Sequence, residues 1–213
     1  MFERFRAFWS KVFSPVVRLL LRMGVSPDAV TIVGTLGVCA GALIFFPRGD
    51  LFVGVLVISA FVFSDIVDGA MARASGRTSP FGAFLDSTLD RVGDAAIFGG
   101  LAMYYVGPGD NDALAALALY CLAMGSVTSY ARARAESLGM QAKVGIAERA
   151  TRLVSILVIT GLADLANILG VGEDALWAIA VTLGLLAVAS TITVFQRILT
   201  VREQSQALTR VGE

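Results

Sequence analysis

The sequence predicts an all-α membrane protein, a polytopic bundle of six transmembrane helices preceded by an N-terminal amphipathic interfacial helix. Of its 213 residues, 56% are hydrophobic and only 16% are charged, which is too apolar for a soluble domain of this size. Long apolar stretches separated by short polar turns fill nearly the whole chain after residue 28, and a helix of roughly 20 apolar residues crosses a bilayer core of about 30 Å. One membrane domain, residues 1–213, accounts for this pattern.

Residues 1–25 predict the interfacial helix. Phe2, Phe5 and Trp9 alternate with Arg4 and Lys11 at roughly helical spacing, which is typical of a helix that lies in the membrane surface. A cleaved signal peptide would place its charges ahead of one uninterrupted apolar run, whereas here the charges are spread throughout. We therefore expect this segment to remain on the chain.

The bundle is predicted within residues 30–198, followed by a cytoplasmic tail at residues 199–213. The apolar runs place its six spans at Val30–Phe46, Leu51–Arg73, Phe81–Tyr105, Ala113–Tyr130, Thr151–Leu169 and Ala175–Ile198. Of the 17 Lys and Arg residues, only Arg48 lies in a turn that follows an odd-numbered span. The positive-inside rule therefore predicts a multi-pass protein of the cell membrane, with both termini and the basic loops in the cytoplasm.

Composition excludes several classes of function. The net charge is zero, so nucleic-acid binding has no basis at the level of the whole protein. Cys39 and Cys121 each lie inside an apolar run, where a small buried side chain is expected rather than a disulfide. The sequence contains no histidine, which excludes Ser-His-Asp and Cys-His catalysis and histidine-bound zinc.

Four aspartates lie near the facing ends of the second and third spans. Asp65 and Asp68 are three residues apart, and Asp86 and Asp90 are four apart, so on helices each pair shares one face. Each pair lies about 14 or 15 residues from the far end of its span, which is about 21–22 Å at a rise of 1.5 Å per residue. Antiparallel packing of the two spans therefore brings both pairs to one level.

Four carboxylates inside a membrane require compensation. A carboxylate at a helix centre costs about 2.5–3.5 kcal/mol, so four cost on the order of 10 kcal/mol, and the nearby cations Arg73 and Arg91 are too few to neutralise them. Carboxylates clustered without histidine or cysteine are hard oxygen ligands suited to Mg²⁺, Mn²⁺ or Ca²⁺. A two-metal site is the simplest interpretation; the alternative is that these aspartates cap helices or face water near helix ends.

The complete pattern resembles a known motif. Asp65-x2-Asp68-Gly69-x2-Ala72-Arg73-x8-Gly82-x3-Asp86-x3-Asp90 is similar, at eight fixed positions, to the motif of the CDP-alcohol phosphatidyltransferases, and the helical layout is similar over nearly the whole chain. The resemblance implies a homodimeric membrane enzyme that transfers the phosphatidyl group of CDP-diacylglycerol to an alcohol and releases CMP. It also implies that the four aspartates bind Mg²⁺ or Mn²⁺, two ions per site, and that Asp90 is the general base.

The resemblance further implies contacts with the CDP-lipid. The residues concerned are Asp28, Ala29, Val30, Thr31, Gly69, Ala72, Arg73, Ser79 and Gly82. The family more often has Asn where this chain has Asp28, and the alternative for the stretch from Asp28 to Thr31 is a plain N-cap. For Gly69 and Gly82 the spacing leaves two interpretations open, tight packing of membrane helices or close approach of the backbone to a bulky ligand.

Basic residues at three helix ends on the aspartate side indicate the acceptor. Arg132, Arg152 and Arg197 can converge on a phosphate carried by the acceptor alcohol; the alternative is that they only anchor helices and fix orientation. The arrangement most resembles the actinobacterial phosphatidylinositol phosphate synthases, whose acceptor is inositol 1-phosphate, although those often have Lys at the position of Arg132. Glycerol 3-phosphate, the acceptor of phosphatidylglycerophosphate synthases, is the second candidate.

Two other classes of function were weighed. A divalent-cation or proton-coupled transporter uses intramembrane carboxylates too, but its polar groups would reach both faces of the membrane. Here the outer halves of the spans are almost wholly Leu, Val, Ala, Gly and Phe. A non-catalytic scaffold would not retain four costly carboxylates, so the sequence favours the transferase.

Overall fold

The computed structural model describes residues 14–62, 64–75, 79–171 and 175–211, with the backbone alone at residues 64–66, 75 and 209–211. All regular structure in these ranges is helical. The helices are α2 (Ser14–Arg22), α3 (Pro27–Ala40), α4 (Leu51–Val62), α5 (Ser64–Ser75), α6 (Pro80–Val106), α7 (Asp112–Ser137), α8 (Arg149–Ile168) and α9 (Trp177–Val211). A π-helical turn, η1 (Gly41–Phe45), and a 3-10 turn, η2 (Phe46–Arg48), connect α3 to α4.

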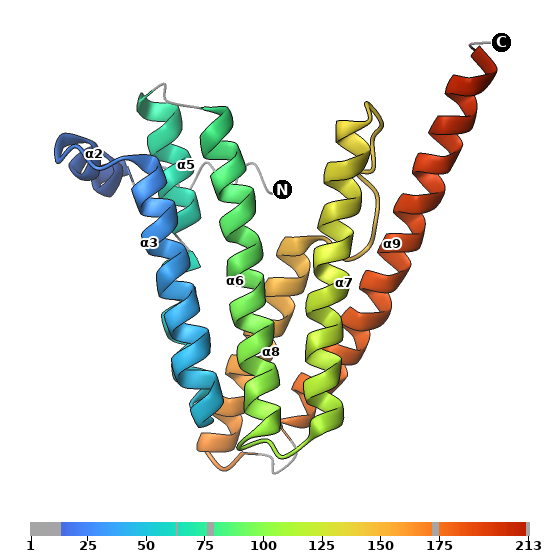
Figure 1. Ribbon diagram of the computed structural model, residues 1–213. Coiled ribbons are helices and arrows are strands. Elements are labelled where there is room, and N and C mark those ends of the chain that lie inside the picture. Colours follow the sequence, from blue (N-terminus) through green and yellow to red (C-terminus); the bar gives the residue numbers. More distant parts are fainter. Residues whose placement is uncertain (1–13, 63, 76–78, 172–174, 212–213) are drawn as a thin grey trace.

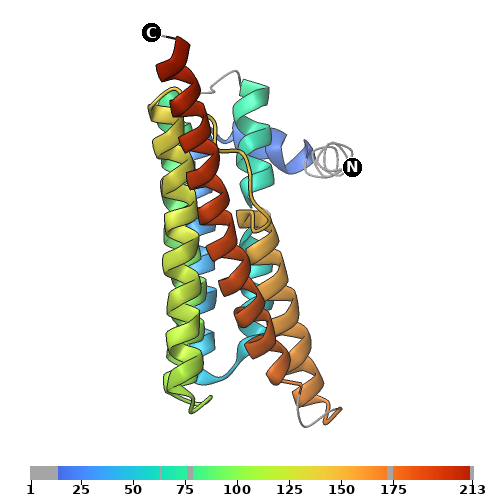
Figure 2. The same ribbon diagram turned by 90° about the vertical axis from the view of Figure 1, so that its right-hand side faces the viewer.

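The long helices stand side by side, and α2 lies across them near one end of the bundle (Figure 1). At that end α6 begins and α7 ends, and the C-terminal part of α9 extends there as well. Figure 2 shows α9 crossing the bundle obliquely and extending past the other helices. The segment predicted as a tail from residue 199 is therefore helical as far as Val211.

Five of the described helical segments are long and apolar enough to cross a membrane. They are Pro27–Arg48, Leu51–Ala74, Asp112–Ser137, Arg149–Ile168 and Trp177–Leu208. Helix α6, with 27 residues, runs beside them (Figure 1) but carries Asp86, Asp90, Arg91 and Asp94 within its first 15 residues. These findings confirm an all-helical, multi-pass membrane fold, whereas five rather than all six of the predicted spans qualify by length and composition.

Helix α2 covers the end of the predicted interfacial helix, and residues 1–13 of that prediction lie outside the described residues. Val17 of α2 is buried against Val67 and Met71 of α5, while Val16 and Leu19 are exposed. This helix therefore presents apolar side chains both to the bundle and away from it.

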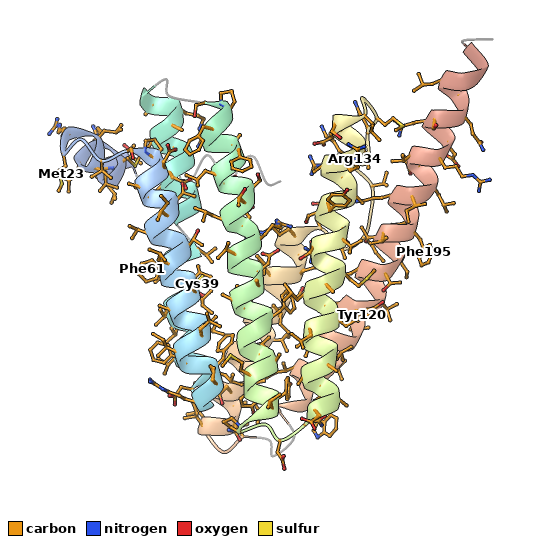
Figure 3. The ribbon with its side chains drawn as sticks, in the orientation of Figure 1. Met23, Cys39, Phe61, Tyr120, Arg134 and Phe195 are labelled. Atoms are coloured by element: carbon orange, nitrogen blue, oxygen red, sulfur yellow. The ribbon has the colours of Figure 1, made fainter. Side chains whose placement is uncertain are left out.

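One continuous apolar core joins α3, α4, α6, α7, α8 and α9. Phe46, Ile58, Leu101, Ile156 and Leu183 in this core are fully buried. On the outside, large apolar side chains point away from the bundle, Phe195 and Met23 among them (Figure 3). Cys39 is half-buried against the core and Cys121 is buried, and both are free thiols, as predicted.

Glycines set the closest helix approaches within this core. A Cβ added at Gly100 of α6 would lie 2.7 Å from the carbonyl oxygen of Ala42, and one at Gly54 of α4 would lie 2.7 Å from Cε1 of Phe46. Small residues let membrane helices pack backbone to backbone. The α3–η1 segment is thereby fixed between α4 and α6.

Helix α3 also organises the end of the bundle that carries the aspartates. It packs against both α5 and α6, whereas α5 and α6 make little direct backbone contact with each other in the described part of the chain. The sequence interpretation placed the second and third spans face to face. Instead, the two aspartate-bearing helices, α5 and α6, each pack against α3. Their acidic residues approach one another next to α3, not through a direct contact between α5 and α6.

Candidate functional site

Asp68 is held by α3. Its side chain is 7% exposed, and its Oδ2 accepts a hydrogen bond of 2.5 Å from the Thr31 hydroxyl. Helix α3 begins with Ser26 as N-cap, whose hydroxyl accepts a bond of 3.2 Å from the amide of Ala29, and with Pro27 in its first turn. The helix cap is thus Ser26, and the alternative N-cap role of the stretch that begins at Asp28 is wrong.

The α6 aspartates face the same space. Asp86 is exposed and Asp90 is partly buried, and the negative charges of both lie close enough to act on the Asp68 carboxylate. Asp65 lies on α5, one turn before Asp68, but its side chain is outside the described residues. Three of the four predicted metal ligands therefore lie within range of one another's charge. Among the described side chains, no three or more carboxylates or thiols are already drawn close enough to enclose an ion.

The beginnings of α3 and α6 meet at Gly82. Ser79 is the N-cap of α6, and its hydroxyl accepts a hydrogen bond of 2.9 Å from the Gly82 amide. A Cβ at Gly82 would lie 3.3 Å from Oγ of Ser79 and 3.5 Å from Oδ1 of Asp28. Three of the predicted CDP-lipid residues, Asp28, Ser79 and Gly82, are thus neighbours in space, although Asp28 is far from the other two in the chain.

The other predicted CDP-lipid residues divide into two groups. At Gly69 of α5, an added Cβ would lie 3.4 Å from the guanidinium of Arg73 and would meet no neighbouring helix among the described side chains. Ala72 lies half-buried in the same turns. On α3, Ala29 is half-buried, and Val30 packs against the apolar cluster between α2 and α5. The side chain of Val30 is therefore occupied by packing, which the motif did not indicate.

A cavity of about 730 Å³ opens beside Asp90, between α6, α7, α8 and α9. Six basic residues and three acidic residues contribute to its lining. They are Arg91, Arg132, Lys143, Arg149, Arg152 and Arg197, with Asp90, Glu136 and Glu148. The structure thus brings the three predicted acceptor arginines to one cavity, which they share with the predicted general base.

The three predicted arginines are held differently. Arg152 is 2% exposed and donates to the carbonyl oxygens of Ala147 and Gly125, at 3.0 and 3.5 Å. Arg197 is buried and donates to the carbonyl oxygens of Val144 and Thr128. These two side chains therefore also fasten the α7–α8 loop, residues 138–148, to the helices around the cavity.

Arg132, by contrast, lies on the rim. Nearly half of its side-chain surface is exposed, and its Nε lies 3.0 Å from Oε1 of Glu136, one turn along α7. Such an exposed pair contributes little stability. Its guanidinium is therefore available to an anion that enters the cavity.

Sequence reasoning missed Asp94 and Arg149. Asp94 is 5% exposed and lies one turn beyond Asp90 on α6. Arg149 opens α8 and bridges the two aspartates, with Nη1 2.9 Å from Oδ1 of Asp90 and Nε 2.9 Å from Oδ1 of Asp94. The spacing of four residues from Asp86 to Asp90 to Asp94 is the signal that could have found the first of these, because it extends one acidic helix face.

The chain is similar to known proteins over most of its length. Residues 24–195 match the CDP-alcohol phosphatidyltransferase family. The chain is 55% identical to a phosphatidylinositol phosphate synthase of Streptomyces avermitilis, over 94% of this chain and 82% of that protein. It is 48% identical to a phosphatidylinositol phosphate synthase of Cutibacterium acnes, over 97% of this chain and all of that protein.

Solved structures extend the comparison to the fold. The Mycobacterium tuberculosis phosphatidylinositol phosphate synthase with CDP-DAG bound is 42% identical, with a TM-score of 0.83 over 90% of this chain and 94% of that chain. The same enzyme in complex with manganese and citrate gives a TM-score of 0.80 at 43% identity, over 88% and 87% of the two chains. Motif, fold and matched length agree, and the chain belongs to the CDP-alcohol phosphatidyltransferase family.

Proposed function

We propose that this enzyme moves the phosphatidyl group of CDP-diacylglycerol onto a hydroxyl of inositol 1-phosphate, giving phosphatidylinositol phosphate and CMP. The observation that carries the proposal is the position of Asp90, which belongs both to the group of aspartates around Asp68 and to the basic cavity. A base at that boundary can meet the acceptor and the CDP-lipid together. The names of the relatives, and the CDP-DAG bound to one of them, support this choice of reaction.

Divalent cations complete the site. The carboxylates of Asp68, Asp86 and Asp90 provide hard oxygen donors from two helices, and with Asp65 they make the donor set that Mg²⁺ and Mn²⁺ prefer. A solved relative contains manganese. We propose two ions per site, which when bound neutralise the pyrophosphate and the charge that develops on the leaving CMP.

The chain's own residues carry the remaining steps. Asp90 accepts the proton of the attacking hydroxyl, the acceptor oxygen forms the new bond to the lipid-side phosphorus, and the bond from that phosphorus to the CMP oxygen breaks. The arginines of the cavity, Arg132, Arg152 and Arg197, bind the acceptor's own phosphate, which favours phosphorylated alcohols over neutral ones.

The CDP-lipid is proposed to bind on the other side of the aspartates. Gly82, beside Ser79 and Asp28, leaves room for the nucleotide at the beginning of α6. Gly69 and Ala72 likewise carry no bulky side chain, so they leave room for a ligand on the surface of α5 beside Arg73. An added Cβ at either glycine would meet side-chain atoms at 3.3 Å or more, whereas at Gly100 it would meet backbone at 2.7 Å, which supports the interpretation that a ligand approaches there.

We further propose how the protein sits in the cell. Helix α6 crosses the membrane as the third predicted span and brings the total to six, since its acidic half faces the proposed ion site rather than lipid, and α2 lies at the membrane surface. The charge distribution places both termini and the active site on the cytoplasmic side of the cell membrane. The enzyme works there as a homodimer, with membrane lipid around it and no nucleic-acid partner.

An acceptor panel tests the reaction. Purified protein receives CDP-diacylglycerol with Mn²⁺ or Mg²⁺ and one acceptor at a time, and CMP release is measured. Inositol 1-phosphate is expected to give the highest kcat/KM, above glycerol 3-phosphate and free inositol. A preference for glycerol 3-phosphate would change the assigned acceptor but leave the assigned reaction class intact. Absence of CMP release with every acceptor would refute the transferase activity itself.

The substitution Asp90→Asn tests the base. It removes the proton acceptor and only one ligand of the cations, so kcat is expected to fall by about 10²-fold or more, while CDP-diacylglycerol still binds. CMP release and CDP-lipid binding are measured on the same preparation. Turnover equal to that of the unmodified enzyme would contradict the assignment.

A further inference from the structure

Asp94 is a buried carboxylate beneath the cavity. One turn of α6 separates it from Asp90, and it faces three guanidinium groups. Its Oδ1 lies 2.9 Å from Nε of Arg149, and its Oδ2 lies 3.7 Å from Nη1 of Arg91 and 3.9 Å from Nη2 of Arg152. A single ion pair would have compensated the burial of one carboxylate, so this surplus of cations requires another reason.

Arg149 is the most constrained of these cations. It makes the contacts of 2.9 Å with Asp90 and Asp94, and its Nη2 also donates to the backbone carbonyl of Asp90 at 3.4 Å. Three atoms of α6 thus hold one guanidinium that comes from the start of α8. Its side chain is still 29% exposed, and it lines the cavity.

The same contacts connect two helices that otherwise barely meet. Helices α6 and α8 make little direct backbone contact in the described residues, so long side chains span the distance at the level of the cavity. Arg152, one turn below Arg149, lies over Gly125 of α7, where an added Cβ would be 3.1 Å from its Nη2. Asp94 is the carboxylate that both arginines approach.

The charges of this cluster do not balance. Asp90 and Asp94 carry two negative charges, against three positive charges on Arg91, Arg149 and Arg152. Guanidinium groups held this close repel one another unless an anion lies between them. Asp94 supplies that anion from below, and the remaining positive charge faces the cavity, where a phosphate would neutralise it.

We propose that Asp94 is a positioning residue that orients Arg149 and Arg152 for the phosphate of the acceptor, with Arg149 as the cation that sets this phosphate beside Asp90. The inference rests on the proposed function and extends it. To the arginines that bind the phosphate of the acceptor, it adds Asp94 as the residue that fixes the acceptor's orientation. Preorganised guanidinium groups lose less freedom when the phosphate binds.

The substitution Asp94→Asn tests the proposal, since Asn keeps the shape and removes the charge. The KM for inositol 1-phosphate is expected to rise at least tenfold, while kcat changes by less than threefold and the KM for CDP-diacylglycerol stays the same. Thermal-shift titration with inositol 1-phosphate should show the same weakening without turnover. An unchanged KM and an unchanged titration would overturn the proposal.

The chain offers a matched control for burial alone. Asp164 of α8 is also 5% exposed, and its Oδ2 accepts a hydrogen bond of 2.8 Å from the amide of Phe52 at the start of α4, away from the cavity. Asp164→Asn is expected to lower thermal stability and leave the acceptor KM as it was. An equal rise in KM in both variants would reduce Asp94 to a structural role and overturn the proposal.

Arg149→Lys gives a second route if the first variant folds poorly. Lysine keeps the charge but cannot reach both aspartates as the guanidinium does, so the acceptor KM should again rise about tenfold. In the double variant Asp94→Asn/Arg149→Lys, the rise in acceptor KM should be smaller than the product of the two single rises, because both substitutions act through one contact. A rise equal to that product would contradict the mechanism. If the unmodified enzyme fails to prefer phosphorylated acceptors, the proposed function fails; if it prefers them and Asp94→Asn keeps that preference in full, only this inference fails.

Discussion

At the scale of single residues, the site depends on carboxylates that are held by neutral or cationic partners from other helices. The Thr31 hydroxyl holds Asp68 at 2.5 Å, and Arg149 holds Asp90. Since α5 and α6 barely touch, these partners from α3 and α8 determine where the carboxylates point. Their substitution should change binding of cation and acceptor before it changes the fold.

Thr31→Val removes the hydroxyl that orients Asp68 and preserves the shape of the side chain. A hydrogen bond to a charged group is worth about 1.5–3 kcal/mol, so the Mn²⁺ concentration that gives half-maximal activity should rise about tenfold or more. Thr35→Val is the control, because the Thr35 hydroxyl donates only to the backbone carbonyl of Thr31, at 3.0 Å. Identical Mn²⁺ dependence in the Thr31 variant and the unmodified enzyme would show that this contact does not support the ion site.

Arg132→Ala and Arg152→Ala should separate binding from stability. Arg132 is exposed, so its loss should raise the acceptor KM and change the free energy of unfolding by no more than about 0.5 kcal/mol. Arg152 is buried beside Asp94, and removing one partner of a buried pair costs about 3–5 kcal/mol, so its loss should raise KM and also lower thermal stability markedly. Kinetics and thermal unfolding on both variants would check this; equal stability would contradict the buried role of Arg152.

A fixed spacing that defines one helix face is the residue-level signal that sequence carries best. The negative charges of Asp86 and Asp90 act on Asp68, and the role of these aspartates as metal ligands stays a prediction. The contacts of Asp94 and Arg149 could not be predicted, because they join helices that are far apart in the chain. The roles of the CDP-lipid and acceptor residues stay predictions, although their positions are known.

At the scale of helices, glycines and caps decide how the elements meet. Apolar runs predicted the helices themselves, since length and composition suffice to identify spans. They did not predict that α9 continues to Val211, because the segment beyond residue 198 is polar and its helix is supported by the α7–α8 loop. Gln204 of α9 exchanges hydrogen bonds with the backbone of Gln141 in that loop, at 2.9 and 2.6 Å, a contact with no signal in local sequence.

Two adjacent glycines of α6 provide a test of the helix packing. Gly100→Ala would place a methyl group 2.7 Å from the carbonyl oxygen of Ala42, whereas the methyl group of Gly99→Ala would meet no atom of the described residues within 4 Å. Overpacking typically costs about 1–3 kcal/mol, so the first variant should unfold at a distinctly lower temperature and the second at an equal or slightly higher one. Equal melting temperatures would mean that α3 and α6 can separate at this point without cost.

At the scale of the whole molecule, the aspartates and the basic cavity lie in the half of an apolar bundle where α6 begins and α7 ends. Asp86 and Asp90 are in the first half of α6, and Lys143 and Glu148 of the α7–α8 loop help to line the cavity, while apolar side chains cover the outer faces. In a bilayer around such a bundle, we expect the site to face water on one side and lipid at its flank. That is the arrangement required by an enzyme with one lipid substrate and one water-soluble substrate.

Binding of Mn²⁺ tests most directly the central claim that carboxylates from α5 and α6 form one cation site. Electron paramagnetic resonance counts free Mn²⁺ in titrations of the purified enzyme and of the Asp68→Asn, Asp86→Asn and Asp164→Asn variants. The account predicts that affinity falls at least tenfold in the first two and stays unchanged in the third, whose carboxylate caps α4 instead. Titrations of the Asp68 and Asp86 variants that coincide with that of the unmodified enzyme would contradict it.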